Sequence, residues 1–237
     1  MRYTFVLVHG AWHGGWCWKR VAERLRTREH VVYTPTLTGL GERSHLLSPT
    51  VGLNTHIADV ANVIAWEELD QIVLCGHSYG GMVIAGVAER LAAKIRCIVF
   101  LDAFLPRNGE ATIDLVPPGF QQSIRERLQA GEMVLPPRSA EAFAVNEADR
   151  AWVDRMCVPQ PAAAFTERIA LTGAYERISS KTYIRAAGYA SASFDAACAR
   201  AKADHSWRAE EIDCGHDVMV DRPDWLADRL IAAAEAA

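Results

Sequence analysis

A serine flanked by two glycines is the clearest chemical signal in the sequence. The motif Gly76-x-Ser78-x-Gly80 follows an apolar, strand-like run and precedes a helix-like segment. A sharp strand-to-helix turn strains its central residue, and glycines are needed on both sides because side chains there would collide with the turn. The turn also presents the Ser78 hydroxyl at a helix N-terminus, which favours developing negative charge. The pattern therefore predicts that Ser78 is a nucleophile.

A serine hydroxyl is a weak nucleophile and needs a neighbouring base. The chain has 8 histidines, and His216 differs from the others because it lies in the loop 212–217, directly after the last predicted strand. In a parallel sheet this loop opens at the same edge as the serine turn, so the two side chains can meet. We expect His216 to be the general base.

Attack on a carbonyl carbon creates an oxyanion, which backbone N–H groups stabilise. In this kind of turn the donors come from the residue after the nucleophile and from the loop after the first strand. Those residues are Tyr79 and Ala11, and Gly10 allows the loop to approach Ser78 closely. We expect the amides of Ala11 and Tyr79 to form the oxyanion hole.

Alternating strands and helices must position these groups. Apolar, β-rich runs predict strands, and segments with a 3.6-residue period predict helices, one of them capped by Asn54 and another begun by Pro223. Such alternation indicates an α/β fold with a parallel sheet covered by helices on both faces. The predicted strands are 3–8, 30–34, 71–75, 95–101, 181–185 and 208–212, and the predicted helices are 16–27, 54–69, 79–93, 193–203 and 223–236.

The segment 106–180 breaks the alternation. It is rich in proline, its apolar residues follow a helical period, and it holds no convincing strand. A long insertion between two sheet strands is expected to form a helical cap. The chain is therefore predicted to be a single domain, with a core of residues 1–105 and 181–237 and a cap of residues 106–180.

Composition excludes several classes of protein. The 237 residues are 50% hydrophobic and 23% charged with a formal net charge of −4, which gives no electrostatic reason to expect nucleic acid or an anionic membrane as a partner. The 6 cysteines are widely spaced, and we expect reduced thiols. No signal peptide, membrane span or cluster of metal ligands is evident. We expect a cytoplasmic protein without metal or cofactor.

These motifs resemble the α/β-hydrolase superfamily. Within it, the segment VLVHGAWHGGWCW at 6–18 looks like the plant methyl esterase and hydroxynitrile lyase family, which includes salicylate-binding esterases and related bacterial esterases. The likeness runs along most of the chain and is weakest in the cap. It implies a compact sheet of about six strands and an order of roles in which the triad acid lies between serine and histidine.

The position of the triad acid departs from the plant enzymes, where it follows the penultimate strand. Here that strand runs into residues 186–193, which include no carboxylate, and Asp195 comes late enough to begin a helix. The preceding strand 95–101 ends directly before Asp102, as in the haloalkane dehalogenase branch. We therefore predict Asp102 as the acid. The alternatives are that Asp102 only caps a turn and that Asp195 is the acid.

The resemblance implies a serine hydrolase that cleaves a small carboxylic ester through an acyl-enzyme. One alternative is a hydroxynitrile lyase, but the lyases have a threonine and a cyanide-binding lysine where this chain has Gly10 and Asp217. A negative Asp217 beside His216 is expected to repel cyanide. The other alternative is a ligand-binding receptor on a hydrolase scaffold. A dehalogenase is disfavoured because its nucleophile is an aspartate.

The substrate is the least defined part of the prediction. Aromatic side chains of the first loop and cap could contact an apolar or aromatic ester, although packing of the cap on the core is the favoured interpretation for most of them. The expected partner is a small-molecule ester, and nothing in the sequence indicates an oligomeric state. The candidate substrate-binding residues are Trp12, Phe104, Phe120 and Trp152.

Overall fold

A six-stranded parallel sheet forms the centre of the molecule. The computed structural model describes residues 1–237, and its strands lie in the order β2-β1-β3-β4-β7-β8, each parallel to its neighbours. The predicted fold class and strand number are therefore confirmed. The strands are β1 (Thr4–Val8), β2 (Val31–Tyr33), β3 (Ile72–His77), β4 (Ile95–Leu101), β7 (Lys181–Ala186) and β8 (Trp207–Ile212).

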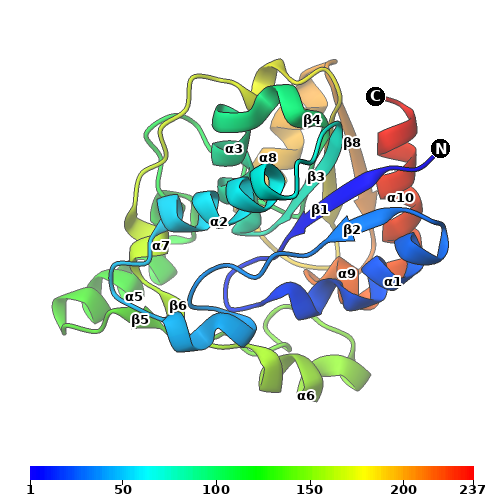
Figure 1. Cartoon of the computed structure of the whole chain (residues 1–237). Helices are drawn as coiled ribbons and strands as arrows, with labels where there is room; N and C mark the ends of the chain where they lie inside the picture. Colours follow the sequence, from blue (N-terminus) through cyan, green and yellow to red (C-terminus); the bar gives the residue numbers. More distant parts are fainter.

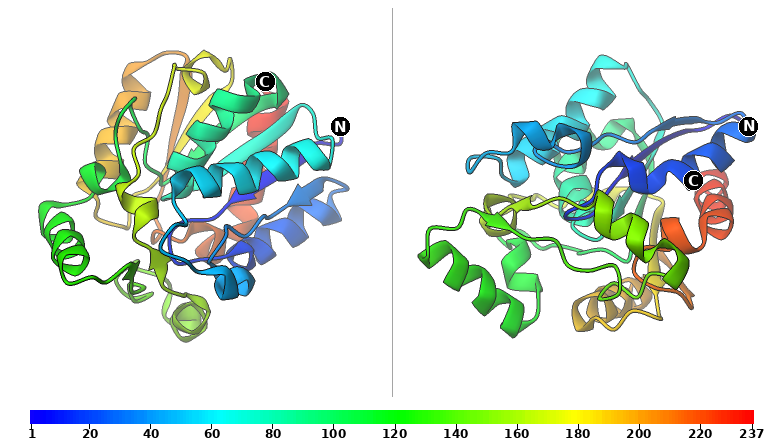
Figure 2. Two further views of the ribbon diagram at one scale, coloured as in Figure 1. Left: turned by 60° about the vertical axis from the view of Figure 1, so that its left-hand side comes forward. Right: turned by 90° about the horizontal axis from the view of Figure 1, so that it is seen from below.

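Helices cover both faces of this sheet (Figures 1 and 2). α1 and α10 pack against each other on one face, α2 and α3 pack together on the other, and α8 lies against β7 and β8. All β3 residues are buried, which agrees with the nearly continuous apolar sequence of a strand covered on both sides. The helices are α1 (Lys19–Thr27), α2 (Leu53–Trp66), α3 (Gly80–Leu91), α8 (Ala192–Ala203), α9 (Val218–Asp221) and α10 (Pro223–Glu235), with 3-10 turns η1 (Gly15–Trp18), η2 (Gly41–Leu46) and η3 (Ala92–Lys94).

Most of the segment between β4 and β7 lies beside the carboxyl ends of the strands, at the lower side of Figure 1, and its last part returns to the opposite edge to enter β7. It is mostly helical, as expected, but it also includes a two-stranded antiparallel ladder, so the expectation that it holds no strand was wrong. The ladder pairs only two residues on each side, which is too short to give a strand pattern in the sequence. The elements are α4 (Thr112–Leu115), α5 (Pro118–Gln129), β5 (Val134–Leu135), α6 (Glu147–Met156), β6 (Gln160–Pro161), α7 (Ala163–Thr166) and the 3-10 turn η4 (Tyr175–Arg177).

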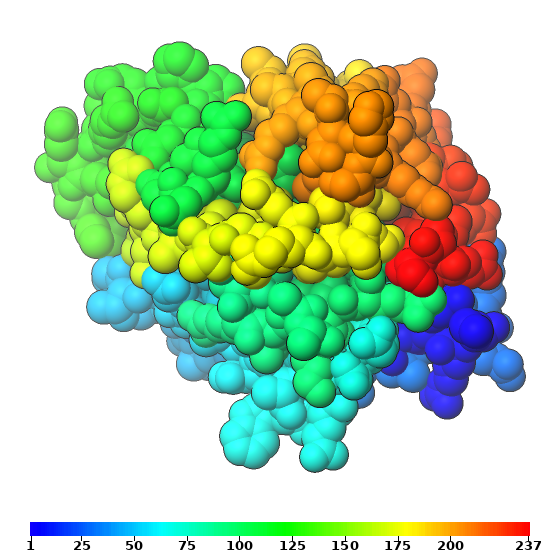
Figure 3. Space-filling view, turned by 90° about the horizontal axis from the view of Figure 1, so that it is seen from above, coloured from blue at the N-terminus to red at the C-terminus, as the bar shows by residue number.

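One hydrophobic cluster of 71 buried residues joins the sheet to this segment. In Figure 3 the yellow return segment that leads back to β7 runs across the surface beside the orange helix α8. The shared cluster supports our proposal that the chain is one domain, with residues 1–105 and 181–237 as its core and 106–180 as its cap. None of the helices is long and apolar enough to cross a membrane.

The start of α2 differs from the sequence prediction. The helix begins at Leu53, and its N-cap is Gly52, whereas Asn54 was expected to be the cap. The backbone N–H and the side-chain amide of Asn54 both donate to the Glu167 carboxylate, at 2.8 and 2.6 Å. A carboxylate from the far end of the cap therefore takes the place of a local capping side chain at the positive end of the helix.

Candidate active site

Ser78 occupies a turn that only glycine neighbours allow. Its φ of +53° is in the left-handed region, which costs energy for a residue with a side chain. A Cβ on Gly76 would lie 2.5 Å from the Gly80 carbonyl oxygen, and one on Gly80 would lie 2.7 Å from the Val8 carbonyl oxygen. The two flanking glycines are thus required by the close approach of the backbone, as the motif predicted.

Asp102 lies directly after β4 and contacts His216. The imidazole Nδ1–H donates to Asp102 Oδ2 at 2.6 Å, and both side chains are buried. The second carboxylate oxygen, Oδ1, accepts from the Arg185 guanidinium at 2.7 Å and from the Ala186 amide at 3.1 Å. Every oxygen of this buried carboxylate therefore has a donor, which fixes its orientation toward the histidine.

Asp195, the alternative acid, is held away from His216. Its side chain is 65% exposed and accepts from Arg185 Nε at 2.8 Å. Asp195 lies in the first turn of α8, as expected, and its carboxylate pairs with the outer side of the same guanidinium that binds Asp102 on its inner side. The structure therefore brings Asp102 and not Asp195 to the histidine.

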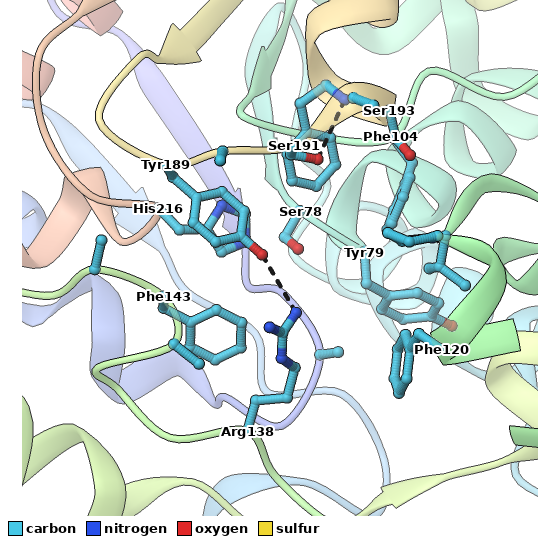
Figure 4. Close-up of a pocket in the computed structure, with 18 of the residues that line it drawn as sticks. Ser78, Tyr79, Phe104, Phe120, Arg138, Phe143, Tyr189, Ser191, Ser193 and His216 are labelled. Carbon is cyan, nitrogen blue, oxygen red and sulfur yellow. Dashed lines mark hydrogen bonds between the residues drawn. The ribbon is translucent and has the colours of Figure 1, made fainter. Parts of the chain in front are cut away.

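A pocket of about 380 Å3 joins the predicted groups. Ser78, His216, Ala11 and Tyr79 all line it, and Figure 4 shows Ser78 and His216 in facing parts of its wall. The backbone amides of Ala11 and Tyr79 donate no hydrogen bond to other protein groups, so both are free to bind an oxygen atom of a ligand. This pairing of unused donors is the arrangement that an oxyanion requires.

Most of the pocket wall is apolar, and 14 of its 21 lining residues are hydrophobic. Of the four candidate substrate-binding residues, Trp12, Phe104 and Phe120 line this pocket. Trp152 does not line it, so this prediction is corrected. The Trp152 ring packs edge-on against Trp16, 5.1 Å between centroids, because the apolar side of α6 faces the core.

Sequence reasoning missed Tyr189, Phe194 and Arg185, and it included Phe143 only among the apolar side chains of the cap. Phe143, Tyr189 and Phe194 surround the His216 ring with centroid distances of 5.4, 4.6 and 5.3 Å. Tyr189 and Phe194 follow the predicted strand 181–185. This region was considered only as a possible source of the triad acid. The role of Arg185 had no signal in the sequence, because a lysine or arginine at a strand end is common on a solvated surface.

A buried ion pair lies beneath the pocket. His13 Nε2 lies 3.0 Å from Asp217 Oδ2, and His13 Nδ1 donates to the Ala11 carbonyl at 2.8 Å. Burial opposes charge on both partners, but Asp217 raises the pKa of His13 well above its usual range, and His13 holds the pKa of Asp217 well below its own. Asp217 does not line the pocket. The expectation that its charge faces a ligand was therefore wrong.

Four other buried histidines have lowered pKa values; one of them, His30, lies away from the site, and the other three support its loops. Burial lowers the pKa of His9 to about 3 and also lowers those of His56 and His77, the latter with the help of neighbouring His216. Their ring nitrogens bond locally: His77 Nε2 donates to the His216 carbonyl at 3.0 Å, and His56 Nε2 donates to the Thr38 carbonyl at 3.0 Å. They therefore support the loops of the site as uncharged hydrogen-bonding groups.

These histidines predict that the folded protein is sensitive to mild acid. In the unfolded chain each one has a pKa near 6.5 and gains a proton below that pH, whereas in the folded chain it takes up this proton only at a lower pH. Their stabilising contribution is complete above pH 6.5 and is lost as the pH falls, by up to about 1.4 kcal/mol per pH unit for each. His13 has the opposite sign, and its contribution is complete below pH 6.5.

The check is the urea midpoint of unfolding, measured at pH 7.0 and at pH 5.5. We expect a clear decrease at the lower pH, because in this interval four histidines with lowered pKa values act against the fold, His13 offsets only one of them, and carboxylates with ordinary pKa values remain ionised. A midpoint that stays constant or rises on acidification would contradict the lowered pKa values of these side chains.

No group of three or more histidine, cysteine, aspartate or glutamate side chains is arranged to hold a metal ion. All 6 cysteines are free thiols, five of them buried.

Comparison with known proteins agrees with this geometry. A family model described as "Alpha/beta hydrolase family" matches residues 5–229. A carbendazim hydrolyzing esterase from Nocardioides sp. is 43% identical over 238 residues, which covers 97% of this chain and 98% of that protein. An alpha-hydroxynitrile lyase from Arabidopsis thaliana is 32% identical over 106 residues, 44% of this chain and 41% of that one, and plant methylesterases also match.

Among solved structures, an extracellular alpha/beta-hydrolase from a Paenibacillus species superposes with a TM-score of 0.86. Its sequence is 25% identical, the match covers 98% of both chains, and it is described as sharing structural and functional homology with tobacco salicylic acid binding protein 2. The resemblance stated from the first loop and the serine turn is thereby confirmed.

Proposed function

The chain belongs to the alpha/beta hydrolase family, and from this premise we propose that it is a serine esterase that cleaves a small carboxylic ester through a Ser-His-Asp triad. The observation that carries the proposal is the 2.6 Å hydrogen bond between the buried Asp102 and His216, which lines the same pocket as Ser78. The esterase named among its relatives supports the same reaction class.

The mechanism has two half-reactions. Ser78 Oγ attacks the ester carbonyl carbon while His216 takes its proton, and the amides of Ala11 and Tyr79 bind the oxyanion. His216 then protonates the leaving alcohol, and water repeats the sequence to release the acid. Asp102 keeps the ring in the tautomer whose Nε2 is unprotonated before attack, and it stabilises the imidazolium that forms.

We expect the substrate to be a small ester with an apolar or aromatic part, and the size and lining of the pocket support this class. The pocket volume of about 380 Å3 is at the lower end of the range for ligand sites. The name of the Nocardioides relative adds carbendazim as a compound to include in a substrate panel.

Gly10 argues against the hydroxynitrile lyase alternative. A Cβ at this position would lie 2.9 Å from Ser78 Cβ and 3.0 Å from His77 Nδ1, so the loop has no room for the threonine of the lyases. Asp217 does not line the pocket, so its charge does not distinguish the esterase from the lyase. The receptor alternative is disfavoured because the pocket supplies both a base and two free oxyanion donors around the serine.

The proposal predicts that a fluorophosphonate ester labels the protein covalently at Ser78. We expect one adduct per chain, found by mass spectrometry on the peptide that includes this residue, and a proportional loss of 4-nitrophenyl acetate hydrolysis. Ser191 and Ser193 also line the pocket and serve as internal controls that stay unlabelled, because their hydroxyls bond to backbone groups: Ser191 Oγ accepts from the Phe194 amide, and Ser193 Oγ donates to the Leu115 carbonyl. With mandelonitrile no benzaldehyde should form. Hydrolysis that persists after full reaction, or an adduct elsewhere, would refute the assignment.

A further inference from the structure

The mouth of the pocket includes a single permanently charged side chain. Most of the exposed lining residues come from the segments 138–144 and 188–192, so these two segments border the opening. Arg138 is in the first of them, and no aspartate or glutamate lines the pocket. The chain has a net charge of −4. A lone guanidinium at the opening of an apolar pocket therefore creates a local region of positive potential.

The guanidinium is held over the pocket by weak contacts that leave most of its donors free. Arg138 Nη1 donates to the Tyr189 hydroxyl at 3.4 Å, and its Cζ atom lies 5.6 Å from the centre of the Phe143 ring. Figure 4 shows the group directed from the mouth toward Tyr189. By contrast, Arg127 and Arg150 of the cap are each paired with a glutamate. Arg138 is thus oriented, but its charge is not neutralised.

The proposed reaction fixes which part of an ester reaches this side of the pocket. His216 must give a proton to the leaving oxygen, so the alcohol part of the ester lies beside the imidazole, while the carbonyl oxygen lies at the amides of Ala11 and Tyr79. The rings of Tyr189 and Phe143 lie next to the imidazole, and Arg138 contacts both of them. The leaving group therefore extends from His216 toward Arg138.

We propose that Arg138 determines specificity on the leaving-group side of the pocket by binding a carboxylate carried at the far end of an aromatic alcohol. An arginine fork binds a carboxylate through two parallel N–H donors, and the Tyr189 and Phe143 rings form a surface for a flat phenol between that carboxylate and His216. This inference rests on the proposed function and adds a substrate class to it, namely acyl esters of hydroxybenzoates.

The test compares two acetate esters of the same shape, 4-acetoxybenzoate and the neutral 4-acetoxybenzamide. In the wild-type protein and in Arg138→Gln, kcat/KM is measured for both, and the ratio of the anionic to the neutral ester is compared. We expect the ratio to fall about tenfold in Arg138→Gln, mainly through KM, which corresponds to one charge-assisted contact at a partly exposed site. Because both esters are measured in both proteins, the difference in their chemical reactivity cancels.

Two controls locate the effect. Arg125 is an exposed arginine of α5 that does not line the pocket, and Arg125→Gln removes the same charge from the cap, so it should keep the wild-type ratio. The second pair is 4-nitrophenyl hemisuccinate and the neutral 4-nitrophenyl butyrate. In this pair the carboxylate of the anionic ester is on the acyl part. The ratio for this pair should not depend on Arg138.

The outcomes separate the inference from the function on which it rests. An unchanged hydroxybenzoate ratio in Arg138→Gln, an equal change in Arg125→Gln, or a change confined to the hemisuccinate pair overturns the role of Arg138 and leaves the esterase assignment intact. If no ester of either pair is hydrolysed above the rate of Ser78→Ala, the proposed function and the inference both fail.

Discussion

Ser78→Ala is expected to lower kcat for 4-nitrophenyl acetate by about 10⁵- to 10⁶-fold, the cost seen when a triad nucleophile is removed. Alanine keeps the Cβ, so the left-handed turn at φ +53° and the contacts of the flanking glycines are preserved. Only the attacking oxygen is lost. The residual rate then comes from the oxyanion donors and from substrate binding.

The measurement is steady-state hydrolysis, with thermal unfolding as the control for an intact fold. A midpoint equal to that of the wild type together with a lost kcat supports Ser78 as nucleophile. Activity within tenfold of the wild type would show that the pocket hydrolyses esters by another route. Retained binding of an ester without turnover in either protein would instead favour the receptor alternative.

Asp102→Asn is expected to lower kcat by about 10⁴-fold, and the surroundings of Asp102 explain why. Oδ1 accepts from Arg185 and from the Ala186 amide, which are both donors, so an asparagine must place its amide oxygen there. Its NH₂ group then faces His216 Nδ1, which can only accept. The imidazole proton is forced onto Nε2, and in that tautomer the ring cannot take the proton of Ser78.

The matched control is Asp195→Asn. Asp195 contacts the same arginine, but it is largely exposed and does not contact His216, so we expect a change in kcat of less than about fivefold, in keeping with the small effect of losing an exposed ion pair. The pH profile of Asp102→Asn adds a second readout, because activity should recover in part at high pH, where hydroxide can assist the serine. Equal losses in the two variants would reject Asp102 as the triad acid.

Local signals explain what could be predicted from the sequence. The run 95–101 is apolar because both of its faces are covered, and its predicted bounds match β4. The residue that follows such a strand lies at the carboxyl edge, which is why Asp102 could be placed near His216 without any contact information. The serine turn could be recognised because part of its requirement for glycine is local: a Cβ on Gly76 would meet the Gly80 carbonyl within the turn itself, whereas the contact of Gly80 with Val8 of β1 has no local pattern.

Contacts between distant parts of the chain explain what was missed. The partners His13 and Asp217 are 204 residues apart, and Trp12 donates to Gln160 of the cap ladder across 148 residues. Neither pairing has a local pattern. Trp152 was misplaced for a related reason: an aromatic residue on a cap helix can face either the pocket or the core, and the period of the helix does not distinguish the two.

The contact at Gly10 constrains the order in which this site could change during evolution. Because a side chain at position 10 would meet both Ser78 and His77, a substitution there is deleterious until the serine turn has shifted. The first loop follows β1 and the serine turn follows β3. A larger residue at position 10 would collide with the serine turn unless that turn had also changed. Descendants of this chain that acquire a new activity through the first loop must therefore carry paired changes, one on each side of that contact.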